Sequence, residues 1–142
     1  MTTRNAKEAG ESAAAAFASG LYCAESVVVT IARQHGIESE LLPRVATAFC
    51  SGMARTCGTC GALTGGIMGI SLVLGRSRPD ESVAPAYEAT QRLIQAFEQE
   101  FGARDCDQLL GCDLGTEAGR ETFREQQLGK RCAAYTAKAA EL

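Results

Sequence analysis

Apolar residues recur at steps of three and four positions along most of the chain, which is the period of a helix that packs on one side. No pair of alternating apolar runs is joined by an Asn-Gly or Asp-Gly hairpin turn. The pattern therefore predicts an all-α fold. We expect a bundle of about five to seven helices with a glycine-rich central helix, forming a single domain over residues 1–142.

Glycines and turn-forming residues divide this pattern into separate helices. The predicted helices run over residues 6–18, from 24 to a stop at Gly36, from the N-cap Ser39 to a stop at Gly52, over 58–74, and from 80 or 82 to a stop at Gly102, followed by a short turn at 106–110 and segments over 117–127 and 128–140. Cys23 then lies at the start of the second helix, and Cys60 near the start of the fourth.

The fourth helix raises the question of a membrane, because the uncharged stretch from Thr56 to Gly75 is about long enough to cross a bilayer. Its first part is hardly apolar, and the strongly hydrophobic part covers only residues 62–74. That length is typical of a buried core helix. We therefore expect no membrane insertion.

Three glycines spaced four residues apart, Gly61, Gly65 and Gly69, share one face of this helix. Glycine inside a helix costs roughly 1 kcal/mol relative to alanine, so the stripe needs a reason. It lets another helix approach closely. At Gly61, beside Cys60, the space could equally admit a partner sulfur or a bound group.

Charge and cysteine content narrow the class of function. The chain holds 14 basic and 17 acidic residues without a basic run, which argues against nucleic-acid binding. The polar N-terminal stretch lacks a secretory hydrophobic region, so we expect a cytoplasmic protein. Seven cysteines accompany a single histidine, and this ratio favours thiol redox chemistry or thiolate ligation of a metal over Ser-His or Cys-His hydrolysis.

Cys57 and Cys60 form a C-x-x-C pair, a spacing that can close a small disulfide or bind one metal ion. At a helix start, Cys60 would face unpaired backbone N–H groups, so we predict a pKa below that of a free cysteine. Cys60 and Cys57 are thus the candidate catalytic residues of a thiol–disulfide oxidoreductase. Cys50, next to Phe49 on an apolar face, is better explained as a small buried hydrophobe.

Metal binding is the alternative use of these thiols. Cys106 and Cys112 are spaced more loosely than a zinc ribbon requires, so zinc is the less favoured metal. An iron–sulfur cluster tolerates more varied spacing. The candidate ligands are Cys23, Cys60, Cys106 and Cys132, with Cys57 and Cys112 as alternates, provided that the helix ends converge. The chain has no C-x-x-C-H motif, so haem is not supported.

Over nearly its whole length the chain resembles the C_GCAxxG_C_C family of redox-active proteins, through the motif from Cys60 to Gly65 with one cysteine before it and two after. The resemblance implies a redox role, with Gly61, Ala62 and Gly65 as motif residues. The corresponding family cysteines would be Cys23, Cys60, Cys106 and Cys132. Some relatives look like the part of split-Soret cytochromes that accompanies an iron–sulfur centre, which implies that such a cluster is an option. Cys50, Cys57 and Cys112 depart from the family pattern.

Three hypotheses follow. In the first, Cys60 exchanges electrons through a disulfide with Cys57 or with a nearby Cys23, Cys106 or Cys132, and the partner is a redox protein or a small thiol. In the second, the chain is an electron-transfer module that holds a cluster. In the third, it is a structural or interaction protein. A homo-oligomer fits each hypothesis.

Overall fold

The computed structural model of the chain describes residues 3–129, 131 and 132. Helices dominate this described part, in which the β-structure is a single isolated bridge between Thr59 and Asp105. The elements are α1 (Thr3–Ala18), α2 (Cys23–Gln34), α3 (Leu41–Ala46), the 3-10 helix η1 (Thr47–Phe49), α4 (Cys50–Arg55), α5 (Gly61–Leu74), α6 (Ala84–Phe101), α7 (Cys106–Leu110) and α8 (Glu117–Glu125). The predicted all-α bundle is confirmed, and α5 is its glycine-rich central helix.

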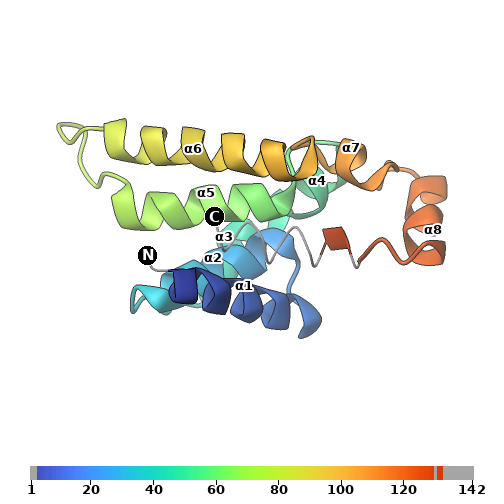
Figure 1. The fold of residues 1–142 in the computed structure, drawn as a ribbon, viewed down its shortest axis with the longest axis horizontal. Coiled ribbons are helices and arrows are strands. Elements are labelled where there is room, and N and C mark those ends of the chain that lie inside the picture. Colours follow the sequence, from blue (N-terminus) through green and yellow to red (C-terminus); the bar gives the residue numbers. More distant parts are fainter. Residues whose placement is uncertain (1–2, 130, 133–142) are drawn as a thin grey trace.

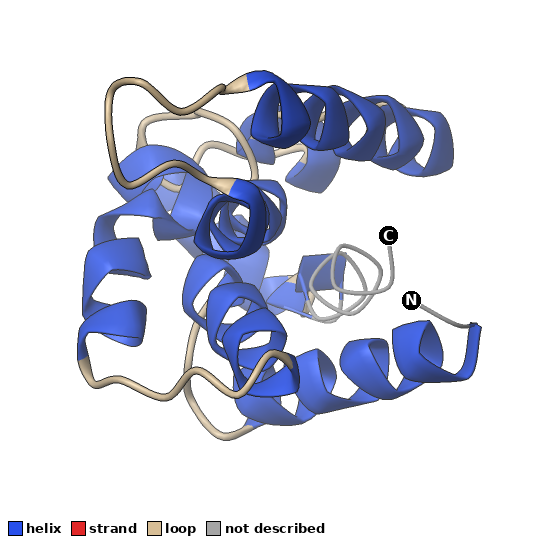
Figure 2. Ribbon diagram, turned by 90° about the vertical axis from the view of Figure 1, so that its left-hand side faces the viewer, coloured by secondary structure: helices blue, strands red, loops and turns tan. Residues whose placement is uncertain are grey.

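The long helices stack in the order α6, α5, α2, α1, while α3 packs against α2 (Figure 1). Figure 2 shows the same stack turned by 90°. Helices α7 and α8 continue beyond one end of the stack. The core between these layers holds fully buried side chains such as Val27 of α2, Leu63 of α5 and Phe97 of α6. Burial of these apolar faces supplies the main stabilisation of the bundle.

The glycine stripe of α5 lies against α2. A Cβ atom added at Gly65 would lie 2.6 Å from the carbonyl oxygen of Ala24, and one added at Gly69 would lie 2.5 Å from Cδ1 of Ile31. The predicted close approach of a second helix is therefore confirmed. In the described part of the chain, no helix combines the length and the apolar character that crossing a bilayer requires.

Two predicted helix stops are confirmed, because Gly36 and Gly102 take the left-handed conformation with φ of +73° and +80°. The start of α5 differs from the prediction, since the helix begins at Gly61 instead of residue 58. The preceding residues bond to another segment: the Cys60 N–H donates to the carbonyl oxygen of Arg104 at 2.7 Å. This pairing keeps the backbone before Gly61 out of the helix.

The predicted helix from Ser39 to Gly52 is divided in the structure into α3, η1 and the first part of α4. Within α4 the four residues from Ser51 to Ala54 have left-handed backbone angles, with φ between 57° and 65°. The segment predicted as a final helix over residues 128–140 lies mostly outside the described residues.

Candidate functional site

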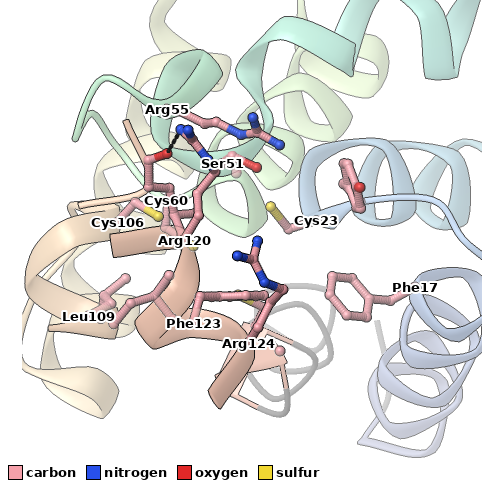
Figure 3. A pocket seen from close by; sticks show the side chains of 16 residues that line it. Phe17, Cys23, Ser51, Arg55, Cys60, Cys106, Leu109, Arg120, Phe123 and Arg124 are labelled. Atoms are coloured by element: carbon pink, nitrogen blue, oxygen red, sulfur yellow. Dashed lines mark hydrogen bonds between the residues drawn. The ribbon is translucent and has the colours of Figure 1, made fainter. Parts of the chain in front are cut away.

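Four cysteines line one cavity of about 340 Å³, at the end of the bundle where α2, α5, α7 and α8 meet (Figure 3). Cys23 is the first residue of α2, Cys60 the N-cap of α5, and Cys106 the first residue of α7. The remaining lining residues are mainly apolar or basic. The full lining is Phe17, Tyr22, Cys23, Ser51, Arg55, Cys60, Gly61, Cys106, Leu109, Leu110, Leu114, Arg120, Phe123, Arg124, Gly129 and Cys132. The structure thus brings together the four cysteines singled out in the sequence.

Local capping holds Cys23 in place at the start of α2. The Tyr22 N–H donates to Oε1 of Glu25 at 3.0 Å, and the hydroxyl of Thr47 donates to Oε2 of the same carboxylate at 2.9 Å. One side chain therefore caps α2 and ties it to η1. On its other side, the sulfur of Cys23 occupies the space that a Cβ at Gly61 would fill. Gly61 therefore makes room for this sulfur.

Neighbouring groups favour the thiolate form of Cys23. The thiol of Cys50 has the largest effect on its pKa, and the backbone N–H groups of Ser51 and Ala24 act in the same direction. Burial opposes them, but the pKa of Cys23 is still lowered from 9.0 to about 6. The lowered pKa favours the thiolate of Cys23, which is the form that attacks disulfides.

The sequence interpretation left Cys50 out of the candidate site, but the structure places it beside Cys23. Its side chain is 3% exposed, which agrees with the expected burial, but its thiol contacts the ionised sulfur of Cys23. In the structure the same thiol donates a hydrogen bond to the carbonyl oxygen of Ala46, with 3.6 Å between sulfur and oxygen. Its hydrogen bond to Cys23, followed by burial, raises the pKa of Cys50 well above its usual range. No signal in the sequence pairs Cys50 with a residue so distant along the chain.

The left-handed turn of α4 sets the position of the Ser51 N–H. Such a backbone costs roughly 1–2 kcal/mol per non-glycine residue, and Ser51, Met53 and Ala54 all adopt it. The backbone N–H of Ser51, in this turn, is one of the groups that lower the pKa of Cys23. Strain of this kind is typical of functional sites, where the surrounding structure imposes it.

The predicted lowering of the Cys60 pKa is wrong. The backbone N–H of Ala62 does act in the expected direction, but burial dominates and raises the pKa of Cys60 well above its usual range. Burial, followed by the negative charge of Cys23, raises the pKa values of Cys106 and Cys132 to about 12. Cys23 is therefore the cavity thiol whose pKa is lowered, whereas the pKa values of the other three are raised.

Cys57 and Cys112 lie outside the described lining of the cavity. A hydrogen bond to the carboxylate of Asp113 is the main cause that raises the pKa of Cys57 to about 11. Burial raises the pKa of Cys112. The two members of the C-x-x-C pair thus have different surroundings, since Cys60 faces the cavity and Cys57 faces Asp113.

The thiols as placed do not form a ready metal site. Among the described residues, no group of three or more His, Cys, Asp or Glu side chains could hold a metal ion. Among the described residues, Cys23, Cys50, Cys57, Cys60, Cys106 and Cys112 are free thiols. Cys23, Cys60, Cys106 and Cys132 share a cavity, but their use as ligands stays a prediction.

Comparison with known proteins identifies the family. Residues 21–142, which include all four of these cysteines and the motif from Cys60 to Gly65, match the family described as putative redox-active protein (C_GCAxxG_C_C). The comparison with curated proteins found no match. The comparison with solved structures found none either. The family match spans most of the chain, and the chain therefore belongs to the C_GCAxxG_C_C family.

Proposed function

We propose that the protein carries out thiol–disulfide exchange at the cavity, with the thiolate of Cys23 as the attacking group. The observation that carries this proposal is the proximity of Cys23 and Cys50, because the sulfur of Cys23 and the Cα of Cys50 bound the same space beside Gly61. The Cys50 thiol is also the main cause that lowers the pKa of Cys23. The backbone N–H of Ser51 adds a second donor to the same sulfur. Cys23 lines the cavity and Cys50 does not, so a substrate meets the ionised thiol first.

The first step forms a mixed disulfide. The Cys23 thiolate attacks one sulfur of a partner disulfide, a bond forms between these two sulfurs, and the partner's S–S bond breaks. The electron pair leaves on the partner's other sulfur, which takes a proton from water and departs as a thiol. The Cys50 thiol then no longer has a negative charge beside it.

The second step uses Cys50. Its hydrogen bond to ionised Cys23 is the main cause of its raised pKa, so the pKa falls once Cys23 is in the mixed disulfide. Cys50 loses its proton to solvent and attacks the Cys23 sulfur, and the second partner thiol leaves. Overall, one partner disulfide is reduced to two thiols and the protein gains a Cys23–Cys50 disulfide. A small or protein thiol reductant, in a reducing compartment such as the cytoplasm, restores the two thiols by the reverse exchange.

The motif supports the same chemistry. Gly61 leaves space for the Cys23 sulfur, and Cys60 presents the next thiol on the cavity wall. The sequence interpretation placed the exchange at Cys60, so an attack of Cys60 on Cys23 is the competing second step. The charge of Cys23 also contributes to the raised pKa of Cys60, so the pKa of Cys60 should likewise fall once Cys23 is in the mixed disulfide.

Trapping the intermediates tests the proposal. The fully reduced protein is mixed with a small disulfide, quenched with acid and mapped by mass spectrometry. We expect a Cys23–Cys50 disulfide in the wild type and a lasting mixed disulfide on Cys23 in Cys50→Ser. If the mixed disulfide on Cys23 accumulated in Cys60→Ser instead, the second step would be assigned to Cys60. Disulfide reduction by Cys23→Ser at the wild-type rate would overturn the proposal.

A metal-binding module is the second candidate function, and the convergence of four thiols on one cavity is the observation in its favour. The side chains would have to move, because no described group of three is close enough to hold an ion. We assign no step to a metal. Iron, zinc and sulfide analysis of protein purified without oxygen tests this candidate, and stoichiometric iron that is lost in Cys60→Ser would support it.

A further inference from the structure

The cavity around Cys23 carries an excess of positive charge. Arg55 reaches it from the end of α4, and Arg120 and Arg124 reach it from α8 (Figure 3). Arg120 and Arg124 are four residues apart, so both lie on the same face of that helix. The described lining contains no Asp or Glu. Three positive charges therefore border a cavity whose described lining carries no carboxylate.

These charges are not neutralised within the described part of the protein. No described carboxylate forms an ion pair with Arg55, Arg120 or Arg124. Arg120 is anchored by the bond from Nη1 to the carbonyl oxygen of Leu114, at 3.0 Å. Figure 3 shows the guanidinium group of Arg124 turned toward Cys23. A cleft lined by one sign of charge attracts ligands of the opposite sign and speeds their association.

The rest of the lining is apolar and partly aromatic. Phe17 of α1 and Phe123 of α8 both line the cavity, together with leucine side chains. Phe123 and the two α8 arginines come from the same helix, so an anionic group and an apolar body can be bound by adjacent side chains. An aromatic ring held there would be within reach of the arginines.

We propose that the cavity binds small disulfides that carry a negative charge next to an aromatic or other apolar group. The inference rests on the proposed exchange at Cys23 and names its substrate class. The guanidinium groups bind the substrate anion in the ground state. They also stabilise the thiolate that leaves when Cys23 attacks, because this negative charge forms inside the same cavity.

Two aromatic disulfides of different charge test the inference. Dithiobis(nitrobenzoate) is a dianion, and dithiodipyridine is neutral at neutral pH. Each rate with the protein is divided by the rate of the same disulfide with free cysteine, which removes the difference in intrinsic reactivity. We expect the corrected rate to favour the dianion in the wild type. In Arg120→Gln/Arg124→Gln this preference should fall by about ten-fold.

Two further variants keep the result interpretable. Arg124→Gln alone leaves the hydrogen bond between Arg120 and Leu114 intact. The preference of this variant for the dianionic disulfide should also be lower than that of the wild type. The pair Arg76→Gln/Arg78→Gln removes the same net charge from the exposed loop after α5 and should keep the wild-type preference. If the wild type and all the arginine variants showed the same corrected preference, the inference on substrate charge would be overturned, while the proposed thiol–disulfide exchange at Cys23 would stand. If neither disulfide reacted at Cys23, the proposed function itself would fail.

Discussion

Replacing Cys50 with alanine removes the strongest of the interactions that lower the pKa of Cys23 to about 6. Burial would then oppose only the remaining backbone N–H donors, and the pKa should return to 9.0 or above. At pH 7 the thiolate fraction of Cys23 would fall from about nine-tenths to about one-hundredth.

The rate of alkylation at one pH understates this change. A thiolate of lower pKa is also a weaker nucleophile, with a Brønsted coefficient of about 0.4–0.5. A rise in pKa of about three pH units therefore makes each remaining thiolate more than ten-fold more reactive. This gain offsets most of the smaller thiolate fraction, so the observed alkylation rate at pH 7 falls only several-fold. The midpoint of the pH–rate profile is free of this compensation.

The assay is alkylation of Cys23 as a function of pH, with the modified residue identified by mass spectrometry. We expect a midpoint near 6 in the wild type and a midpoint of 9 or above in Cys50→Ala. Cys50→Ser keeps an O–H donor and should retain a lowered midpoint. If the wild type and both variants shared one midpoint, the reasoning on Cys50 would be refuted.

Three more results are expected. Gly61→Ala places a methyl group against the Cys23 sulfur and should lower the free energy of unfolding in denaturant by about 1–3 kcal/mol, more than Gly66→Ala, whose methyl meets only a movable side chain. Asp113→Asn should lower the pKa of Cys57 from about 11 and speed its alkylation near neutral pH; an unchanged rate would argue against the hydrogen bond. Because the folded-state pKa of Cys23 is lowered, the stability that its ionised form contributes is fully present above the unfolded-state pKa and is lost as the pH falls through about 6. The free energy of unfolding should therefore rise between pH 6 and 9, by at most about 1.4 kcal/mol per pH unit. Denaturation of Cys23→Ser, measured over the same pH range, should lack this rise.

Local signals in the sequence were sufficient for the long helices α1, α2 and α6. The three- and four-residue period and the stops at Gly36 and Gly102 depend on neighbours along the chain, and the structure agrees with both. The glycine stripe of α5 was also readable, because glycines spaced by four must share a helix face. The start of α5 was not readable, since the pairing of Cys60 with Arg104 joins segments far apart in sequence.

The chemistry of the site depends on tertiary contacts. The helix-start argument for Cys60 has the correct sign, yet burial outweighs it, and the depth of burial cannot be derived from six residues of motif. Cys23 has a low pKa because Cys50, in another element, donates to it. The left-handed turn after Cys50 contains only one glycine, so propensity favours an ordinary helix there.

The central claim is that Cys23 is the reactive thiolate. The most direct test treats the native, fully reduced protein with a limiting amount of iodoacetamide near neutral pH and locates the first modified cysteine. We expect Cys23 to be modified first, although it is only 8% exposed, ahead of the more accessible Cys57. Modification of Cys57 or Cys60 before Cys23 would contradict the account, and uniformly slow modification of all seven thiols would favour a structural role.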